Sequence, residues 1–355
     1  MPAATGPQPD DRPAPALRAW VGTYPAVGAG SAVDTGEGIW AVTEDSAGRF
    51  DARQVSRGPA PSFLALSPDG STLLAVGETS PGMVVRYAVQ PGGGLVERER
   101  VTSGGADPCH LLVHPSGRSV YVSQYGSGSL AVLPLEPDAD EWRFAGGIGQ
   151  VFEHSGRGPR ERQAGPHVHS SVLLGDWLLA LDLGTDELRR YRVAPDGALT
   201  VEGVAGRLPH GAGPRHAAVT SEGHLAVTAE LDAHLYLLRW DPEAGVVEPL
   251  DRIALGEPGA ALPAHVVAHG DRLVVGVRGP DEVVTVRAAG GRLAEVGRRV
   301  VATWPRHHAL LGDRLLVAGE RAHRVDVHLQ GRDGTDSGEA VQALTIPSPA
   351  CVLAV

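Results

Sequence analysis

Lysine and asparagine are absent from the 355-residue chain, so all 31 positions counted as lysine or arginine are arginine. The absence of lysine excludes mechanisms that form a Schiff base on the protein, including those of pyridoxal-phosphate enzymes. It also excludes a phosphate-binding loop of the GK[ST] type, and the absence of asparagine excludes Asn-linked glycans. Any anion held by side-chain cations of this chain must therefore be held by arginine and histidine.

Disulfide frameworks, long apolar runs and net positive charge are missing as well. The two cysteines are interpreted as free thiols in a reducing compartment. No apolar run approaches the roughly 20 residues of a membrane helix, and Met1–Pro15 lacks the regions of a signal peptide. The formal net charge of -11 argues against a nucleic-acid partner. We therefore predict a cytoplasmic protein that binds neither membranes nor nucleic acids.

A repeated pattern organises the chain. Seven times, a proline is followed by a short apolar stretch, a turn and a second apolar stretch rich in valine and leucine, which favours strands. By subtraction, successive prolines are 42 to 58 residues apart, the length of a propeller blade of four short strands. The prolines that begin the units are Pro61, Pro108, Pro166, Pro214, Pro263, Pro305 and Pro347.

The two ends of the chain supply complementary parts of one unit. The seventh unit stops after a single strand, 349–355. The chain begins with the three missing strands, predicted at Arg18–Tyr24, Gly38–Glu44 and about Phe50–Val55. Pairing the last strand with the first closes the ring and leaves no open sheet edge. We predict an all-β, seven-bladed β-propeller over residues 17–355, preceded by a disordered tail over 1–16.

Histidine and arginine gather directly after the prolines. In a propeller the first strand of each blade lines the central channel, so these residues should meet at one mouth of that channel. Such a ring of imidazole and guanidinium groups suits an anionic small molecule. If histidine contributes charge, binding weakens as the pH rises through roughly 6–7. The residues are His110, His167, His169, Arg215, His216, His265, Arg306, His307 and His308.

Several motifs within the units resemble one known family. They include WVGTY at 20–24, PHVHS at 166–170, LGTD at 183–186, GAGPRH at 211–216, AEL at 229–231 and VRGPD at 277–281. Together they resemble the seven-bladed propeller lactonases, which include one type of 6-phosphogluconolactonase and the carboxy-cis,cis-muconate lactonising enzyme. The resemblance spans almost the whole chain after residue 17. It departs from the family at Pro280, where members usually have histidine or asparagine before the aspartate.

The resemblance implies an active site of one histidine, one glutamate and two arginines near the channel mouth. By motif, the histidine is His167 or His169, the glutamate is Glu230, and the arginines are Arg215 and Arg278. The glutamate and a histidine would act as base and acid, while the arginines would hold a carboxylate or phosphate. Structural ion pairs are the alternative for the glutamate and the arginines. The resemblance implies neither a metal nor a cofactor.

Other candidate residues have weaker assignments. His110, His216, His265 and His307 are assigned to substrate binding, and the alternative for such histidines is a hydrogen-bonding wedge between blades. Arg157–Arg162 lies in the longest interval and is expected to be a solvated loop, with a position over the mouth as the alternative. The remaining candidates, expected to form a turn or to be buried thiols, are Asp182, Asp186, Cys109 and Cys351.

Three functions remain open at this point. The first is a metal-independent lactonase that hydrolyses a phosphorylated or carboxylated sugar-type lactone. The second is a carboxymuconate-type cycloisomerase, which forms a lactone with the same residues. The third is a non-catalytic propeller that binds a ligand or a protein. A monomer or weak homodimer is expected.

Overall fold

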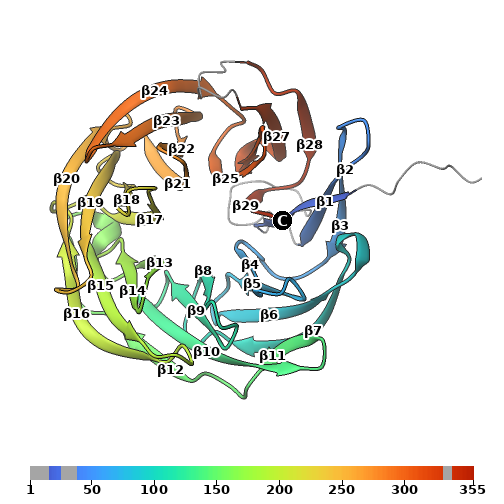
Figure 1. Cartoon of the computed structure of the whole chain (residues 1–355), viewed down its shortest axis with the longest axis horizontal. Coiled ribbons are helices and arrows are strands. Elements are labelled where there is room, and N and C mark those ends of the chain that lie inside the picture. Colours follow the sequence, from blue (N-terminus) through green and yellow to red (C-terminus); the bar gives the residue numbers. More distant parts are fainter. Residues whose placement is uncertain (1–15, 25–37, 331–337) are drawn as a thin grey trace, which may run out of the picture.

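The computed structural model describes residues 16–24, 38–330 and 338–355. Their strands form seven sheets around a central axis (Figure 1), which confirms the predicted all-β, seven-bladed propeller. Residues 1–15 of the predicted tail lie outside the described residues, and its last residue, Ala16, instead begins strand β1 (Ala16–Thr23). Within the described ranges, no helix is long and apolar enough to cross a membrane. Their helical residues form short 3₁₀ turns, η1 (Pro91–Gly93), η2 (Glu161–Gln163) and η3 (Glu320–Ala322).

The blades are numbered in chain order, and their strands are given from the channel outwards. Blade 1 contains β4 (Leu64–Leu66), β5 (Thr72–Gly77), β6 (Met83–Val89) and β7 (Leu95–Thr102). Blade 2 contains β8 (Pro108–Val113), β9 (Ser119–Gln124) and β10 (Ser129–Asp138), which pairs with β11 (Glu141–Phe144) and β12 (Gln150–Glu153). Blade 3 contains β13 (Val168–Leu174), β14 (Trp177–Asp182), β15 (Glu187–Val193) and β16 (Leu199–Arg207).

The remaining blades complete the ring. Blade 4 contains β17 (Pro214–Val219), β18 (Leu225–Ala229), β19 (His234–Asp241) and β20 (Val246–Ala254). Blade 5 contains β21 (Leu262–His269), β22 (Arg272–Arg278), β23 (Glu282–Ala289) and β24 (Arg292–Val300). Blade 6 contains β25 (Pro305–Leu311), β26 (Arg314–Gly319), β27 (Arg324–Leu329) and β28 (Gln342–Thr345). Blade 7 contains β29 (Pro349–Ala354), β1 (Ala16–Thr23), β2 (Ile39–Glu44) and β3 (Phe50–Ser56).

Blade 7 joins the two ends of the chain. Strand β29 pairs antiparallel with β1, and the register places Val352 opposite Val21 and Ala354 opposite Ala19. The blue and red strands of this blade lie side by side in Figure 1. The predicted ring closure is therefore confirmed.

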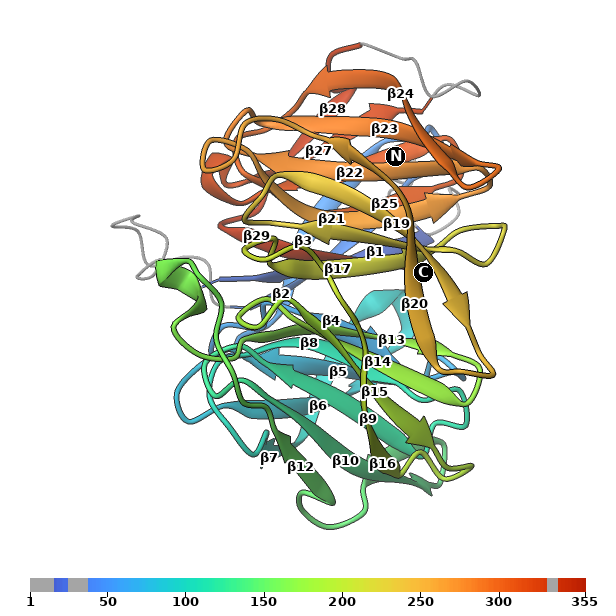
Figure 2. The same cartoon turned by 90° about the vertical axis from the view of Figure 1, so that its left-hand side faces the viewer.

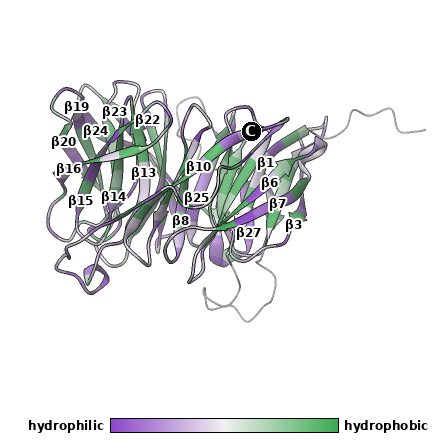
Figure 3. Cartoon of the chain, turned by 90° about the horizontal axis from the view of Figure 1, so that it is seen from below, coloured by the Kyte–Doolittle hydropathy of each residue, from purple (hydrophilic) through white to green (hydrophobic). Residues whose placement is uncertain are grey.

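A separate hydrophobic core fills each of the seven interfaces between neighbouring blades. The alternation of side chains along a strand explains this arrangement. In β14, Leu178 and Ala180 join the core shared with blade 2, whereas Leu179 and Leu181 join the core shared with blade 4. Both faces of such a strand are buried, which accounts for the wholly apolar stretches of the sequence and for the apolar segments within the blades in Figure 3.

We expect removal of residues 348–355 to open the ring and expose the cores on both sides of blade 7. Four successive residues of β29, Pro349 to Val352, are buried, and losing them should lower the thermal midpoint by roughly 10 °C or more. Thermal unfolding followed by circular dichroism measures this. Removal of Val355 alone, which is 48% exposed, serves as the control. A truncated chain that unfolds at the wild-type temperature would contradict the closure.

Candidate active site at the channel mouth

One backbone arrangement, repeated in most blades, brings side chains to the same mouth of the channel. We call the residue at the entry to the first strand of each blade its anchor, which in most blades is the repeated proline. The residue after the second strand donates its backbone N–H to the carbonyl oxygen of the residue before the anchor. Glu230 donates to Gly213 at 2.8 Å in blade 4, and Glu78 donates to Ala60 at 3.0 Å in blade 1. The accepting residue often has positive φ, as at Ala60, Asp107, Gly213, Trp304 and Ser348.

Each blade thus supplies one residue after its anchor and one at the end of its second strand. The residues after the anchors are Ser62, Cys109, His169, Arg215, Ala264, Arg306 and Ala350. Those at or just after the ends of the second strands are Tyr24, Glu78, Tyr125, Leu183, Glu230, Arg278 and Glu320. Two predicted anchors differ from the structure. Val168 and Pro349 begin β13 and β29, two residues after Pro166 and Pro347.

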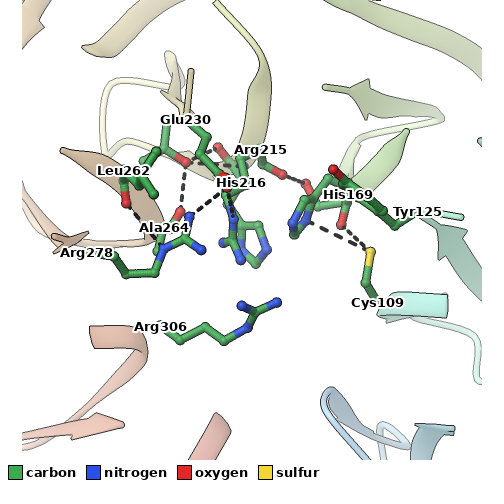
Figure 4. Close-up of polar contacts among 12 residues, drawn as sticks. Cys109, Tyr125, His169, Arg215, His216, Glu230, Leu262, Ala264, Arg278 and Arg306 are labelled. Carbon is green, nitrogen blue, oxygen red and sulfur yellow. Dashed lines mark hydrogen bonds and ion pairs between the residues drawn. The ribbon is translucent and has the colours of Figure 1, made fainter. Parts of the chain in front are cut away.

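Glu230 lies within a cluster of arginines, and the structure brings it together with both predicted arginines. Its Oε2 lies 2.8 Å from Arg215 Nε and 2.6 Å from Arg278 Nη2 (Figure 4). Its Oε1 lies 2.5 Å from Arg162 Nη1. Burial alone would raise the pKa of Glu230, but the three guanidinium groups outweigh burial and hold this pKa well below its usual value. A carboxylate neutralised in this way is a weak base.

Arg215 keeps part of its guanidinium group unpaired. The residue is only 2% exposed, and its Nη1 has no hydrogen-bond acceptor among the described residues. Burial, together with the nearby charge of Arg278, lowers the pKa of Arg215 to about 9, so it remains protonated at neutral pH. A buried N–H without an acceptor is energetically costly. A bound anion would satisfy this donor.

Arg215 faces a small cavity at the mouth. The space open to the centre of a water molecule is about 10 Å³, which is room for about one water. A larger cavity of about 550 Å³, between Leu208 and Leu250 on the outer strands, contains no comparable group of histidines and arginines. The residues that line the mouth cavity are Tyr24, Ser62, Phe63, Glu78, Cys109, His169, Arg215, His216, Arg306, His307 and Ala350.

Glu78 is a second carboxylate at this cavity. Both of its oxygens lie 2.7 Å from the hydroxyl of Tyr24, which donates to them, and Oε2 also accepts a hydrogen bond from Ser62. Arg306 donates in turn to the Tyr24 oxygen at 2.5 Å. Desolvation raises the pKa of Glu78 above its usual value, although Arg306 and the hydrogen bonds from Ser62 and Tyr24 favour the ionised form.

The four histidines assigned to substrate binding pack together inside the channel. His265 and His307 stack with ring centroids 3.6 Å apart, and His216 contacts both His110 at 5.7 Å and His265 at 5.4 Å. Burial is the main cause that lowers the pKa of all four, for His110 to about 3. These rings are therefore neutral at pH 6–7, so they do not supply the histidine charge expected from the sequence.

This histidine cluster also borders a second cavity. His307 lines both the mouth cavity and this one, which has a volume of about 570 Å³ and is formed where β21, β25 and β29 end. The role in substrate binding stays a prediction. Of the hydrogen bonds expected of wedges between blades, His307 Nδ1 accepts one from the Val352 N–H at 3.3 Å, whereas His110 Nδ1 and His265 Nδ1 have no partner among the described residues.

The two histidines of PHVHS take different positions. His169 lines the mouth cavity, and its pKa is well below the usual value because of burial and the Arg215 charge. His167 instead stacks on Tyr125 at 4.3 Å, with its Nδ1 2.7 Å from the Tyr125 carbonyl oxygen. His167 precedes β13 and a register shift follows Val168, which accounts for the different positions of the two side chains. His169 is therefore the one placed beside Arg215.

Arg162 reaches the site from the long insertion between β12 and β13. This segment projects from one face of the ring, where it appears in green in Figure 2. The side chain is 45% exposed and pairs with Glu230, and its Nη2 donates to the Tyr125 hydroxyl at 3.2 Å. Most of 157–162 is exposed, as expected of a solvated loop, and Arg162 also takes the alternative position over the mouth, where it pairs with Glu230. The 58-residue interval was the only sequence signal.

The sequence interpretation missed Glu78, although a repeated pattern marks it. The residues VGE at 76–78, TAE at 228–230 and AGE at 318–320 all place a glutamate directly after the second strand of a blade. Glu230 was found by its family motif, and aligning the other blades on it identifies Glu78 and Glu320. Tyr24, after β1, occupies the same position in blade 7.

The remaining candidates have structural roles. Asp186 accepts hydrogen bonds from the backbone N–H groups of Gly211 and Gly213 at 2.7 and 2.8 Å, which holds the loop that leads to Arg215. Asp182 accepts one from His154 at 2.7 Å. The described residues contain no group of three or more histidine, cysteine or carboxylate side chains placed to bind a metal. Cys109 and Cys351 are buried free thiols, as predicted.

We expect Glu230→Gln to lower the free energy of unfolding by about 3–5 kcal/mol at pH 7, because two buried arginines lose their counter-charge. The folded-state pKa of Glu230 is lowered, so this contribution is present above about pH 4.5 and is lost as the pH falls below it. Urea unfolding at pH 7 and at pH 3–4 measures both effects.

Glu136→Gln is the matched control for that variant. Glu136 pairs with Arg143 at the surface, where the side chains are 40% and 49% exposed, so its loss should cost less than about 1 kcal/mol. Equal urea midpoints for the two variants at pH 7 would show that the Glu230 cluster does not stabilise the fold.

Comparison with known proteins identifies the family. The profile described as a seven-bladed β-propeller lactonase matches residues 18–354. The 6-phosphogluconolactonase of Bacillus subtilis (strain 168) is 26% identical over 353 residues, covering 94% of this chain and 97% of its own. Two solved structures each superpose with a TM-score of 0.84 and cover 96% of this chain and 99% of their own. They are the periplasmic gluconolactonase of Pseudomonas aeruginosa, 28% identical, and a putative 6-phosphogluconolactonase of Bacteroides uniformis ATCC 8492, 26% identical. The chain therefore belongs to the family of seven-bladed β-propeller lactonases.

Proposed function

We propose that the protein hydrolyses a sugar-type lactone that carries a phosphate or carboxylate group, at the channel mouth where Arg215 and Arg278 meet. The observation that carries the proposal is the buried, partly unpaired guanidinium group of Arg215 beside the mouth cavity. Family membership supports the opening of a lactone ring, and the names of the relatives support the substrate class.

The arginines would bind the anionic substrate. Guanidinium groups match phosphate and carboxylate in bidentate geometry, and they also stabilise the oxyanion that forms when water adds to a lactone carbonyl. Glu230 has its two oxygens engaged by arginines. We therefore assign it to orienting Arg215 and Arg278, in place of the base role inferred from the resemblance. The same arginines allow oxyanion stabilisation without a metal ion.

A panel of lactones monitored for acid release tests this proposal. Wild type should hydrolyse 6-phosphogluconolactone or a carboxylated relative faster than the neutral gluconolactone, and EDTA should leave the rate unchanged. Arg215→Lys keeps the positive charge beside Glu230 but loses the planar guanidinium group, which can donate two parallel hydrogen bonds to one anion. It should lower kcat/KM for the anionic lactone by about 10²-fold or more, with a smaller effect on the neutral one.

The exposed Arg118, in the turn between β8 and β9, offers the same substitution away from the mouth, and Arg118→Lys should retain wild-type kinetics. Absence of acid release from every lactone would overturn the proposal. Cyclisation of an unsaturated dicarboxylate without hydrolysis of any lactone would instead assign the lactone-forming reaction.

A further inference from the structure

We propose that Glu78 is the catalytic base that activates the attacking water, an inference that rests on the proposed lactone hydrolysis. The family motifs direct attention to Glu230 as the carboxylate of the site. Two observations favour Glu78: the free coordination capacity of its oxygens, and its position on the wall of the mouth cavity.

Glu230 has little capacity to accept a proton from water. It is 2% exposed, and both of its oxygens contact guanidinium groups at 2.5–2.8 Å. Protonating it would leave Arg215 and Arg278 without a counter-charge, which is why its pKa is held so low. An effective base needs a pKa nearer the working pH.

Glu78 has free capacity at the cavity. Its oxygens together offer about four lone-pair sites, and among the described residues the hydroxyls of Tyr24 and Ser62 are the side-chain donors that reach them. These donors fix the carboxylate in one orientation and leave a site for a water. The cavity has room for about one water, and Arg215 and His169 lie on its wall with Glu78.

The groups around Glu78 set its basicity. Arg306 from blade 6 and the hydroxyls of Tyr24 and Ser62 stabilise the carboxylate, whereas desolvation and the Asp107 charge disfavour it. Burial raises the pKa of the neighbouring Cys109 thiol, which is therefore uncharged. The balance leaves the pKa of Glu78 above its usual value, in contrast to that of Glu230. Two carboxylates whose pKa values differ in this way can take different roles at one site.

The reaction then follows from these positions. The oxygen of the water attacks the lactone carbonyl carbon, and its proton passes to the carboxylate of Glu78. The carbonyl electron pair moves to the oxygen, where the N–H groups of Arg215 stabilise the oxyanion. When the oxyanion collapses, the bond to the ring oxygen breaks, and this oxygen takes the proton back from Glu78. The products are a hydroxyl group and a carboxylic acid, which releases its proton to solvent.

The dependence of kcat/KM on pH tests the assignment, using a lactone that wild type hydrolyses. Wild type should lose activity as the pH falls through a value above 4.5, because the base becomes protonated. Glu78→Gln should lower kcat by about 10²-fold or more and abolish this decrease at low pH, the acid limb of the pH profile. Its thermal midpoint should not fall, because the amide avoids the desolvation of a charge. Ser62→Ala should move the limb to higher pH, since Ser62 stabilises the ionised form.

Glu136→Gln is the control. Glu136 is a surface carboxylate of β10 that pairs with Arg143 and does not line the cavity. This variant should keep the acid limb of wild type. A Glu78→Gln protein with a wild-type kcat and limb would overturn the role of Glu78 and leave the lactonase proposal standing. An unshifted limb in Ser62→Ala would do the same if Glu78→Gln does not fold. A wild type inactive on all lactones would overturn both proposals.

Discussion

The pairing of β29 with β1 closes seven sheets into a ring, and the position of every side chain at the channel mouth depends on it. Each blade presents a residue after its anchor and another at the end of its second strand. The closed ring turns positions as distant in sequence as Tyr24, Glu78 and Arg306 into hydrogen-bonded neighbours. The same closure seals a hydrophobic core on both sides of blade 7. Both the stability of the ring and the geometry of the site therefore depend on the pairing of β29 with β1.

Equivalent backbone positions carry different chemistry at this mouth. Glu78 and Glu230 are both attached through the same backbone hydrogen bond, yet one meets hydroxyl groups and the other meets guanidinium groups. The difference arises from the neighbouring blades, which supply Tyr24 to Glu78 and Arg278 to Glu230. A lactonase site needs both an anion-binding group and a proton acceptor. The propeller provides them by varying single residues on a repeated frame.

The sequence was enough to predict the fold and several of the side chains that meet at the channel mouth. The repeated prolines and the unpaired strands at both ends lead directly to a closed ring, and motifs identify Glu230, Arg215 and Arg278. Glu78 lies outside the family motifs and is marked only by the blade repeat, because Tyr24, which donates to it, is distant along the chain until the ring closes. Arg162 lies in the insertion of the longest interval between repeated prolines, where no repeated motif marks it. The histidines do not carry the charge expected from the sequence, because their burial inside the channel keeps the rings neutral. The sequence alone does not reveal this burial.

The central claim is that the two carboxylates differ in basicity. Carbon-13 NMR of protein labelled at the glutamate side-chain carboxyl carbons measures this directly, with the signals of Glu78 and Glu230 assigned by their Gln variants. The account predicts that Glu78 titrates above about pH 4.5 and Glu230 well below it. Titration of both at the same pH, or in the reverse order, would contradict it.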